Sequence, residues 1–209
     1  GFMHPIMGWV RPTVATFRPP VNSIKTDGVL SIADVLEQHK IKSESIRLVS
    51  FDEQQFYQIA SGKETLYFDS FTGEELDDGG EKYALFLAWH YSAKQSPVEA
   101  TSKIESFSYK YPFINRLLPV QNVSYEDGED YYIHTRSSRL GTVGNSVKDN
   151  MSLFFKLFHN LSVLDSYPKV KLALTTVFMG VIAFVTSTGL LMFFKTWKKS
   201  RKGMRQYHR

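Results

Sequence analysis

The spacing of apolar and polar residues changes several times along the chain and divides it into predicted elements. Apolar residues recur at helical spacing over residues 31–40 and 81–93, and Ser31 stands where an N-cap is expected. Between these helices, three short stretches alternate apolar and polar residues and are separated by glycine-containing turns: 45–51, 54–61 and 64–70. The first half therefore predicts an antiparallel meander between two helices.

The second half repeats this order. Three stretches are predicted as strands: 102–112, 117–127 and 129–137. A glycine-containing turn is expected over 139–145, and helical spacing follows over 149–165. The unit of aromatic strand, glycine turn, polar spacer and amphipathic helix with a late histidine thus occurs twice. Two copies favour a pair of related subdomains over a solenoid.

A long apolar run near the end of the chain predicts a transmembrane helix over residues 169–195. Residues 172–194 carry no charge, and at about 1.5 Å per residue this run crosses a ~30 Å hydrocarbon core. A set of cations with no acid follows directly: Lys195, Lys198, Lys199, Arg201, Lys202, Arg205 and Arg209. Such a cluster places the tail, residues 196–209, in the cytoplasm and the rest of the chain on the other side.

The first residues, 1–10, are apolar and short. They fit a mature N-terminus, the start of an expressed fragment, or the outer end of an upstream transmembrane helix, and we favour the last. Residues 11–30 hold three prolines and little periodicity, which predicts an extended linker. The fold class expected for the remainder is α+β, with one subdomain over residues 31–98 and a second over residues 99–168.

Charge and composition exclude several classes of function. The formal net charge is +4 and comes from the basic tail, since the preceding part is acidic on balance. The charge therefore indicates attraction to anionic lipid and gives no reason to expect nucleic acid. The absence of cysteine excludes disulfides, thiolate metal sites and cysteine nucleophiles. The acidic turns at 77–81 and 126–130 lack calcium-loop spacing, so we expect no metal site there. Without a G-x-S-x-G elbow or a phosphate-binding glycine loop, a binding role is more consistent with the sequence than catalysis.

The strand-and-turn motifs resemble those of PepSY domains, where an aromatic strand ends at a D-x-x-T-G-E turn. The first copy carries the motif at Tyr67, Asp69, Thr72, Gly73 and Glu74. The second copy departs from it, because His134 replaces the aspartate and the Thr-Gly pair is lost. Residues 117–134, the histidine-bearing helix and the apolar run together are similar to bacterial PepSY proteins with an associated transmembrane helix. The likeness covers about residues 30–195.

This resemblance implies a bacterial inner-membrane protein with its main domain in the periplasm. Members of the family occur near iron, haem or siderophore uptake and near membrane reductases, and others are linked to peptidase regulation. The family shares no catalytic residue, so none is transferred to this chain.

Two histidines are candidate haem ligands. His159 lies on the helix before the apolar run, and a neutral imidazole there can ligate haem iron. In four-span relatives, histidines near helix ends are the expected ligands, and His4 could supply a second one from an upstream helix. The alternatives are that His159 packs between helix and sheet or hydrogen-bonds a carbonyl, and that His4 is an interfacial histidine in water. His90 holds the matching place in the first copy with no span after it, which favours structural roles.

Within the apolar run, four small residues share one helix face: Thr176, Gly180, Ala183 and Ser187. Small residues let another helix approach closely, so this face predicts a second transmembrane helix or a membrane subunit as partner, besides lipid. The alternative is that small residues are simply common in spans.

These features predict a membrane-anchored accessory protein or subunit of an iron- or haem-related redox or uptake assembly. The alternative is a non-redox interaction module, such as a peptidase modulator or a structural subunit of an envelope complex. Haem is the cofactor that the first hypothesis allows, and the sequence leaves its presence open.

Overall fold

The computed structural model of this chain describes residues 12–21, 23–62, 64–94, 96–159 and 161–206. The chain forms two compact units, Gly1–Leu153 and Phe154–Arg209. The predictions for residues 1–10, His4 included, lie outside the described residues.

The first unit begins with a linker, one short helix and a three-stranded sheet. Helix α2 (Ile32–His39) starts at Ser31, whose hydroxyl accepts a hydrogen bond from the Ala33 amide at 3.2 Å, so the predicted N-cap is confirmed. The antiparallel sheet has the order β1 (Ser45–Phe51), β2 (Gln54–Ser61) and β3 (Glu64–Asp69). Val35 of α2 packs against Ile59 and Phe68 and covers one face of this sheet.

A four-stranded antiparallel sheet follows in the order β4 (Val98–Ile104), β5 (Val120–Tyr125), β6 (Glu129–His134) and β7 (Arg139–Asn145). The turn expected over 139–145 is wrong, because these residues form β7 and pair with β6. The glycines there allow close packing and do not reverse the chain: a Cβ on Gly141 would lie 2.8 Å from Tyr111 Oη. The reversal lies earlier, in the 3₁₀ turn Thr135–Ser137.

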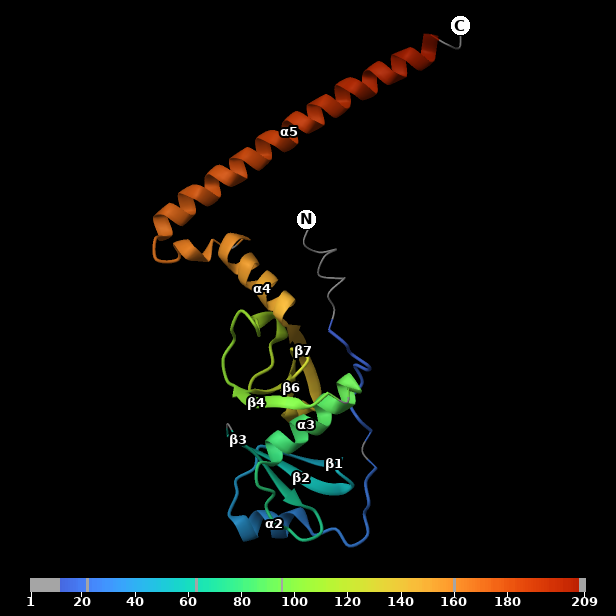
Figure 1. Cartoon of the computed structure of the whole chain (residues 1–209), viewed down its shortest axis with the longest axis vertical. Coiled ribbons are helices and arrows are strands. Elements are labelled where there is room, and N and C mark those ends of the chain that lie inside the picture. Colours follow the sequence, from blue (N-terminus) through green and yellow to red (C-terminus); the bar gives the residue numbers. More distant parts are fainter. Residues whose placement is uncertain (1–11, 22, 63, 95, 160, 207–209) are drawn as a thin grey trace. The chain divides into compact units, whose positions relative to one another are not determined.

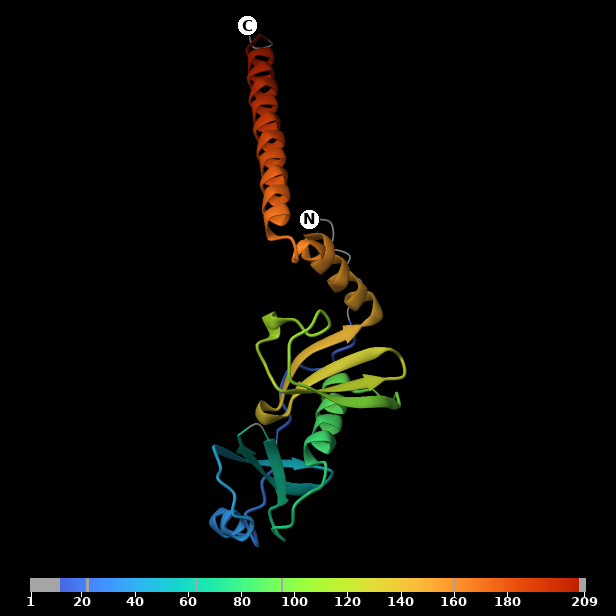
Figure 2. The ribbon, with the colours of Figure 1, turned by 90° about the vertical axis from the view of Figure 1, so that its left-hand side faces the viewer.

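Helix α3 (Gly79–Ser92) connects the two sheets and packs against both. It contacts β3 of the first sheet and β5, β6 and β7 of the second (Figures 1 and 2). One hydrophobic core draws buried residues from both sheets and the helix: Val49, Phe51, Phe56, Tyr67, Tyr83, Ala84, Leu87, Ala88, Tyr91, Val123, Tyr125, Tyr131, Ile133 and Val143. The two sheets therefore share a core, with α3 inside it.

After β7 the chain enters α4 (Ser146–Phe154), and the predicted helix over 149–165 is only partly correct. The α-helix widens to a π-helix at Phe155–His159, and a separate 3₁₀ turn covers Ser162–Leu164. Leu161 has a φ of 47°, a left-handed conformation that a right-handed helix cannot continue through.

The second unit ends in α5 (Pro168–Gln206), and its Pro168–Trp197 part is long and apolar enough to cross a membrane. The coarse fold is thus confirmed as α+β with two antiparallel sheets and a C-terminal apolar helix. That the two halves are related PepSY-like copies stays a prediction.

Candidate partner-binding groove

One of the two predicted haem ligands, His159, lies within the described residues. His159 is the last residue of the π-helical segment Phe155–His159. Its expected partner, His4, lies outside the described residues, so the two-histidine site stays a prediction. Within the described ranges, no group of three or more His, Asp or Glu side chains is placed to hold a metal ion.

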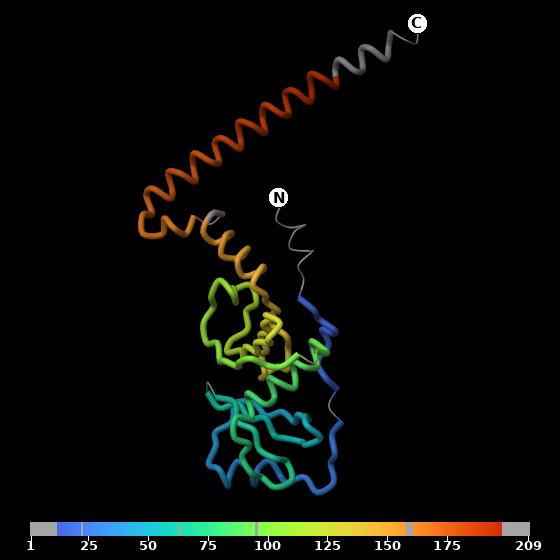
Figure 3. The backbone as a smooth tube through the Cα atoms, viewed as in Figure 1, coloured from blue at the N-terminus to red at the C-terminus, as the bar shows by residue number. Residues whose placement is uncertain are grey.

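His90 has a structural contact. Its Nε2 lies 2.9 Å from the backbone carbonyl of Arg18 in the N-terminal linker. The linker is also joined to α3 by a 2.8 Å hydrogen bond from the Ala15 amide to the Tyr91 carbonyl. Val14 packs against the core beside these contacts. His90 therefore helps to hold the linker along the side of the domain, a path visible in Figure 3.

The turn after β3, which begins at Asp69, is held by hydrogen bonds. The Asp69 carboxylate accepts hydrogen bonds from the amides of Phe71 and Thr72, at 2.7 and 2.9 Å. Gly73 has a φ of 75°, and its carbonyl lies 2.9 Å from His39 Nε2. The motif residues thus close a tight turn and tie it to α2, which explains why they occur together.

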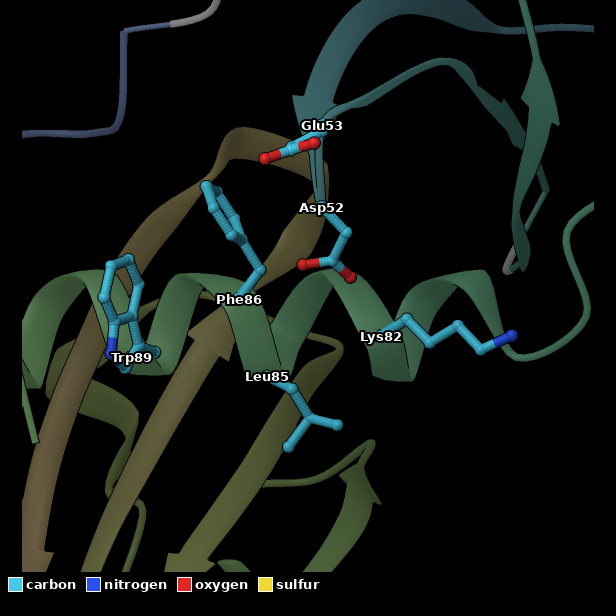
Figure 4. Close-up of a pocket in the computed structure, with 6 residues that line it drawn as sticks. All are labelled: Asp52, Glu53, Lys82, Leu85, Phe86 and Trp89. Atoms are coloured by element: carbon cyan, nitrogen blue, oxygen red, sulfur yellow. The ribbon is translucent and has the colours of Figure 1, made fainter. Parts of the chain in front are cut away.

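A groove lies on the outer side of α3. Its volume is about 580 Å³, and it is lined by residues from α3 and from the β1–β2 turn: Asp52, Glu53, Lys82, Leu85, Phe86 and Trp89 (Figure 4). The four α3 residues stand at i, i+3, i+4 and i+7 and so share one helix face. The opposite face of α3 is buried in the core.

Aromatic rings form the floor of the groove. The Phe86 ring lies 6.1 Å from Phe51 and 6.2 Å from Tyr83, both of which are buried. Trp89 continues this surface outward and is 56% exposed. A large exposed aromatic beside a packed aromatic floor is the arrangement that binding hot spots favour.

An acidic turn forms the rim above this floor. Asp52 and Glu53 join β1 to β2 with φ values of 50° and 63°. Figure 4 shows the Glu53 side chain above Phe86 and the Asp52 carboxylate between Phe86 and Lys82. This two-residue turn normally takes Asn and Gly, because side chains disfavour positive φ. Two acids in that conformation are strained, and strained positions concentrate at functional sites.

The groove combines apolar and charged side chains. Its walls supply an apolar surface, the Asp52 and Glu53 carboxylates, and the Lys82 side chain, whose ammonium extends away from the two carboxylates in Figure 4. Helical spacing predicted α3, but the groove on this face was not predicted. The signal that could have found it is the second apolar row on α3, Leu85, Phe86 and Trp89, outside the row that fills the core.

A second, smaller cavity of about 220 Å³ lies where the β2–β3 hairpin meets the second sheet. The Arg136 guanidinium, which lines this cavity, donates three hydrogen bonds within the domain. Its Nε donates to Thr65 Oγ1 at 3.0 Å, and its Nη2 donates to the carbonyls of Gly62 and Glu64. This cavity therefore belongs to the contact between the two sheets.

Comparison with known proteins identifies no relative: no protein-family model, no curated protein and no solved structure matches the chain.

Proposed function

We propose that this protein is a membrane-anchored accessory subunit whose extramembrane domain binds a segment of another protein in the groove on α3. The observation that carries the proposal is the exposed Trp89 beside the packed aromatic floor and the acidic rim. In this proposal the protein acts by binding, which corresponds to the interaction module expected from the sequence as the alternative function.

The chemistry of the groove defines the partner segment. The aromatic floor favours a bulky apolar side chain, and the Asp52–Glu53 rim favours a neighbouring lysine or arginine. The Lys82 ammonium, which extends away from Asp52 in Figure 4, would pair with an acid further along the segment. We propose a short segment with an apolar anchor and a basic residue next to it.

Anchoring and orientation are part of the same proposal. Helix α5 would cross the bilayer through its Pro168–Trp197 part, with the basic tail in the cytoplasm. The domain would then lie on the outer side, which the PepSY resemblance makes the periplasm of a bacterium. The small residues of the span, Gly180 at their centre, would face a second helix or a membrane subunit.

The groove is tested by crosslinking in native membranes. A photoreactive amino acid in place of Lys82, which lines the groove, should capture a protein partner when the rest of the chain is unchanged. Adding Trp89→Ala should abolish the capture without lowering the melting temperature. Val21→Ala is the matched control, since Val21 is 98% exposed and lies away from the groove lining. Equal capture by the Trp89→Ala variant would rule the groove out.

A second candidate function is haem binding within an iron- or haem-related redox or uptake assembly. It is favoured by the π-helical segment that ends at His159, since π-helical turns are frequent at functional sites. The absorbance spectrum of the protein, purified with its native upstream sequence, tests it. A Soret band that is lost in His159→Ala is expected, and a spectrum without that band would rule out haem.

A further inference from the structure

The loop between β4 and β5, residues 105–119, exposes two large apolar side chains at its tip. Phe113 is 68% exposed and Ile114 is 82% exposed, on the 3₁₀ turn Phe113–Asn115. Tyr109 beside them is 37% exposed. Adjacent exposed apolar residues of this size are uncommon on a soluble surface and indicate a contact with a partner or a membrane.

The base of this loop is fixed by packing and hydrogen bonds. Tyr111 is fully buried, its ring stacks on Tyr132 at 4.9 Å, and its hydroxyl donates to the Leu117 carbonyl at 2.9 Å. Phe107 packs on Tyr111 at 5.9 Å and edge-on against Phe113 at 5.2 Å. These contacts hold the base of the loop in place, so the domain keeps the Phe113–Ile114 tip exposed.

The tip is flanked by positive charge. The loop 105–119 carries two cations, Lys110 and Arg116, and one acid, Glu105 at its start, which pairs with Lys103 at 2.9 Å. Both loop cations stand on the exposed part of the loop, and Lys110 is 48% exposed. Apolar tips with aromatic and basic neighbours match the interfacial region of a bilayer, where rings lie at headgroup level and cations meet anionic headgroups.

The loop also lies at the end of the domain from which the chain leaves for α5. Lys110 Nζ is 3.7 Å from Asp149 Oδ2 on α4, and Figures 1 and 2 both show the loop beside the junction of β7 and α4. Residues 155–167 then lead to α5, and a chain of that length reaches at most about 45 Å.

The N-terminal linker reaches the same end of the domain. The Thr13 amide donates to the Glu129 carboxylate, and Glu129 pairs with Asn145 at the end of β7. The first described residues and the exit to α5 thus lie at one end of the four-stranded sheet. The exposed loop leaves the sheet at its other end, where Ile104 pairs with Val120, and folds back so that Lys110 reaches α4.

We propose that the Phe113–Ile114 tip inserts into the interfacial region of the bilayer that holds α5, with Arg116 and Lys110 meeting anionic headgroups. The inference rests on the membrane anchoring in the proposed function. It adds a second membrane contact, which fixes the tilt of the domain on the bilayer and so the direction in which the α3 groove faces.

The test uses the full chain in nanodiscs of phosphatidylethanolamine and phosphatidylglycerol. Because the chain has no cysteine, a single nitroxide label can be attached at Ile114→Cys, at Phe184→Cys within α5, or at Glu37→Cys on α2 as the aqueous control. Collision with oxygen, which concentrates in lipid, and with a water-soluble nickel chelate reports the depth of each label. We expect the Ile114 label to shift toward the lipid values of Phe184 and the Glu37 label to stay aqueous.

The three labels distinguish failure of the loop inference from failure of the membrane anchor. If the Phe184 label is in lipid while the Ile114 label matches Glu37, the loop inference fails and the anchor stands. If the Phe184 label is aqueous, the anchor fails and the loop inference with it. Shielding of the Ile114 label from both reagents would mean contact with protein and would also overturn the inference.

Removing the Arg116 charge gives a second test, in which insertion of the Ile114 label is measured again. Arg116→Gln in the Ile114→Cys background should lower the ratio of inserted to aqueous label by about five-fold with phosphatidylglycerol, the effect of one cation near an anionic surface. With phosphatidylcholine alone the substitution should change nothing. An equal ratio in both lipids would contradict the role given to Arg116.

Discussion

Gly79 and Tyr67 lie closer together than any side chain at position 79 would allow. A Cβ on Gly79 would stand 2.7 Å from Tyr67 Cβ and 2.8 Å from the Tyr67 ring, and Tyr67 is only 1% exposed. This contact sets how near the first turn of α3 approaches β3.

Gly79→Ala should therefore destabilise the domain. The added methyl meets a buried Cβ that cannot rotate away, and overpacking of this kind typically costs about 1–3 kcal/mol. Urea denaturation checks the change in the free energy of unfolding. Gly80→Ala is the matched control: its nearest atoms would be 3.9 Å away, so a neutral or slightly stabilising effect is expected. Equal losses in both variants would contradict the packing argument.

Arg136 should be more important for stability than its half-exposed position suggests. It joins the first sheet to the second through Thr65, Gly62 and Glu64, and its own carbonyl accepts a hydrogen bond from Arg47 Nη1 at 2.5 Å. Arg136→Met should lower the free energy of unfolding by about 2 kcal/mol, because hydrogen bonds from a charged donor are lost together. Arg139→Met, at an exposed neighbouring position, should change it by less than about 0.5 kcal/mol.

His134 should make the domain less stable in mild acid. Burial, followed by the nearby Arg136, Arg139 and Arg47 charges, lowers the pKa of His134 below its usual 6.5. A histidine with a lowered folded pKa resists protonation in the fold, so its contribution to stability is complete above about pH 6.5 and falls as the pH drops through the folded pKa.

This pH dependence is measured by thermal melting at about pH 7.5 and about pH 5. The difference in melting temperature should be smaller in His134→Asn, which keeps a polar group near Ser137 Oγ, 2.6 Å from His134 Nδ1 in the wild type. His39→Asn is the comparison for a histidine outside this arginine cluster. An unchanged difference in His134→Asn would exclude this residue as the source.

The small-residue face of α5 leads to a prediction about association in membranes. Gly180 and Gly189 both have open space around them, but they lie about 180° apart on the helix. Gly180→Ile should weaken association of the span with a partner helix several-fold in a membrane two-hybrid reporter, because the bulky side chain blocks close approach. Gly189→Ile should have little effect, and similar losses in both would mean that the face has no special role.

Local signals in the sequence account for much of the fold. The alternation over 45–70 gives the three-stranded sheet, Ser31 caps α2, and the apolar run gives α5. The same reasoning failed for β7, because glycine is read as a turn when only the neighbouring sequence is known. Gly141 is needed for the approach of Tyr111, thirty residues earlier in the chain, and no local pattern contains that contact.

The groove shows a similar limit of sequence reasoning. The apolar row on α3 is visible in the sequence, but which row faces the core depends on the positions of both sheets. The acidic rim is supplied by the β1–β2 turn, and only the packing of Phe51 under Phe86 brings that turn over the helix. The candidate site is thus a product of long-range packing.

Because α3 lies in a core shared by both sheets, the domain cannot be divided into two parts that fold separately. A fragment ending before β4 would leave Leu87 and Tyr91 without the partners that bury them, and a fragment starting at β4 would lack the helix that covers its sheet. We therefore expect that neither half folds when it is expressed by itself or exchanged by itself between genes. A recombination event that preserved folding would have to move residues 12–153 as one piece.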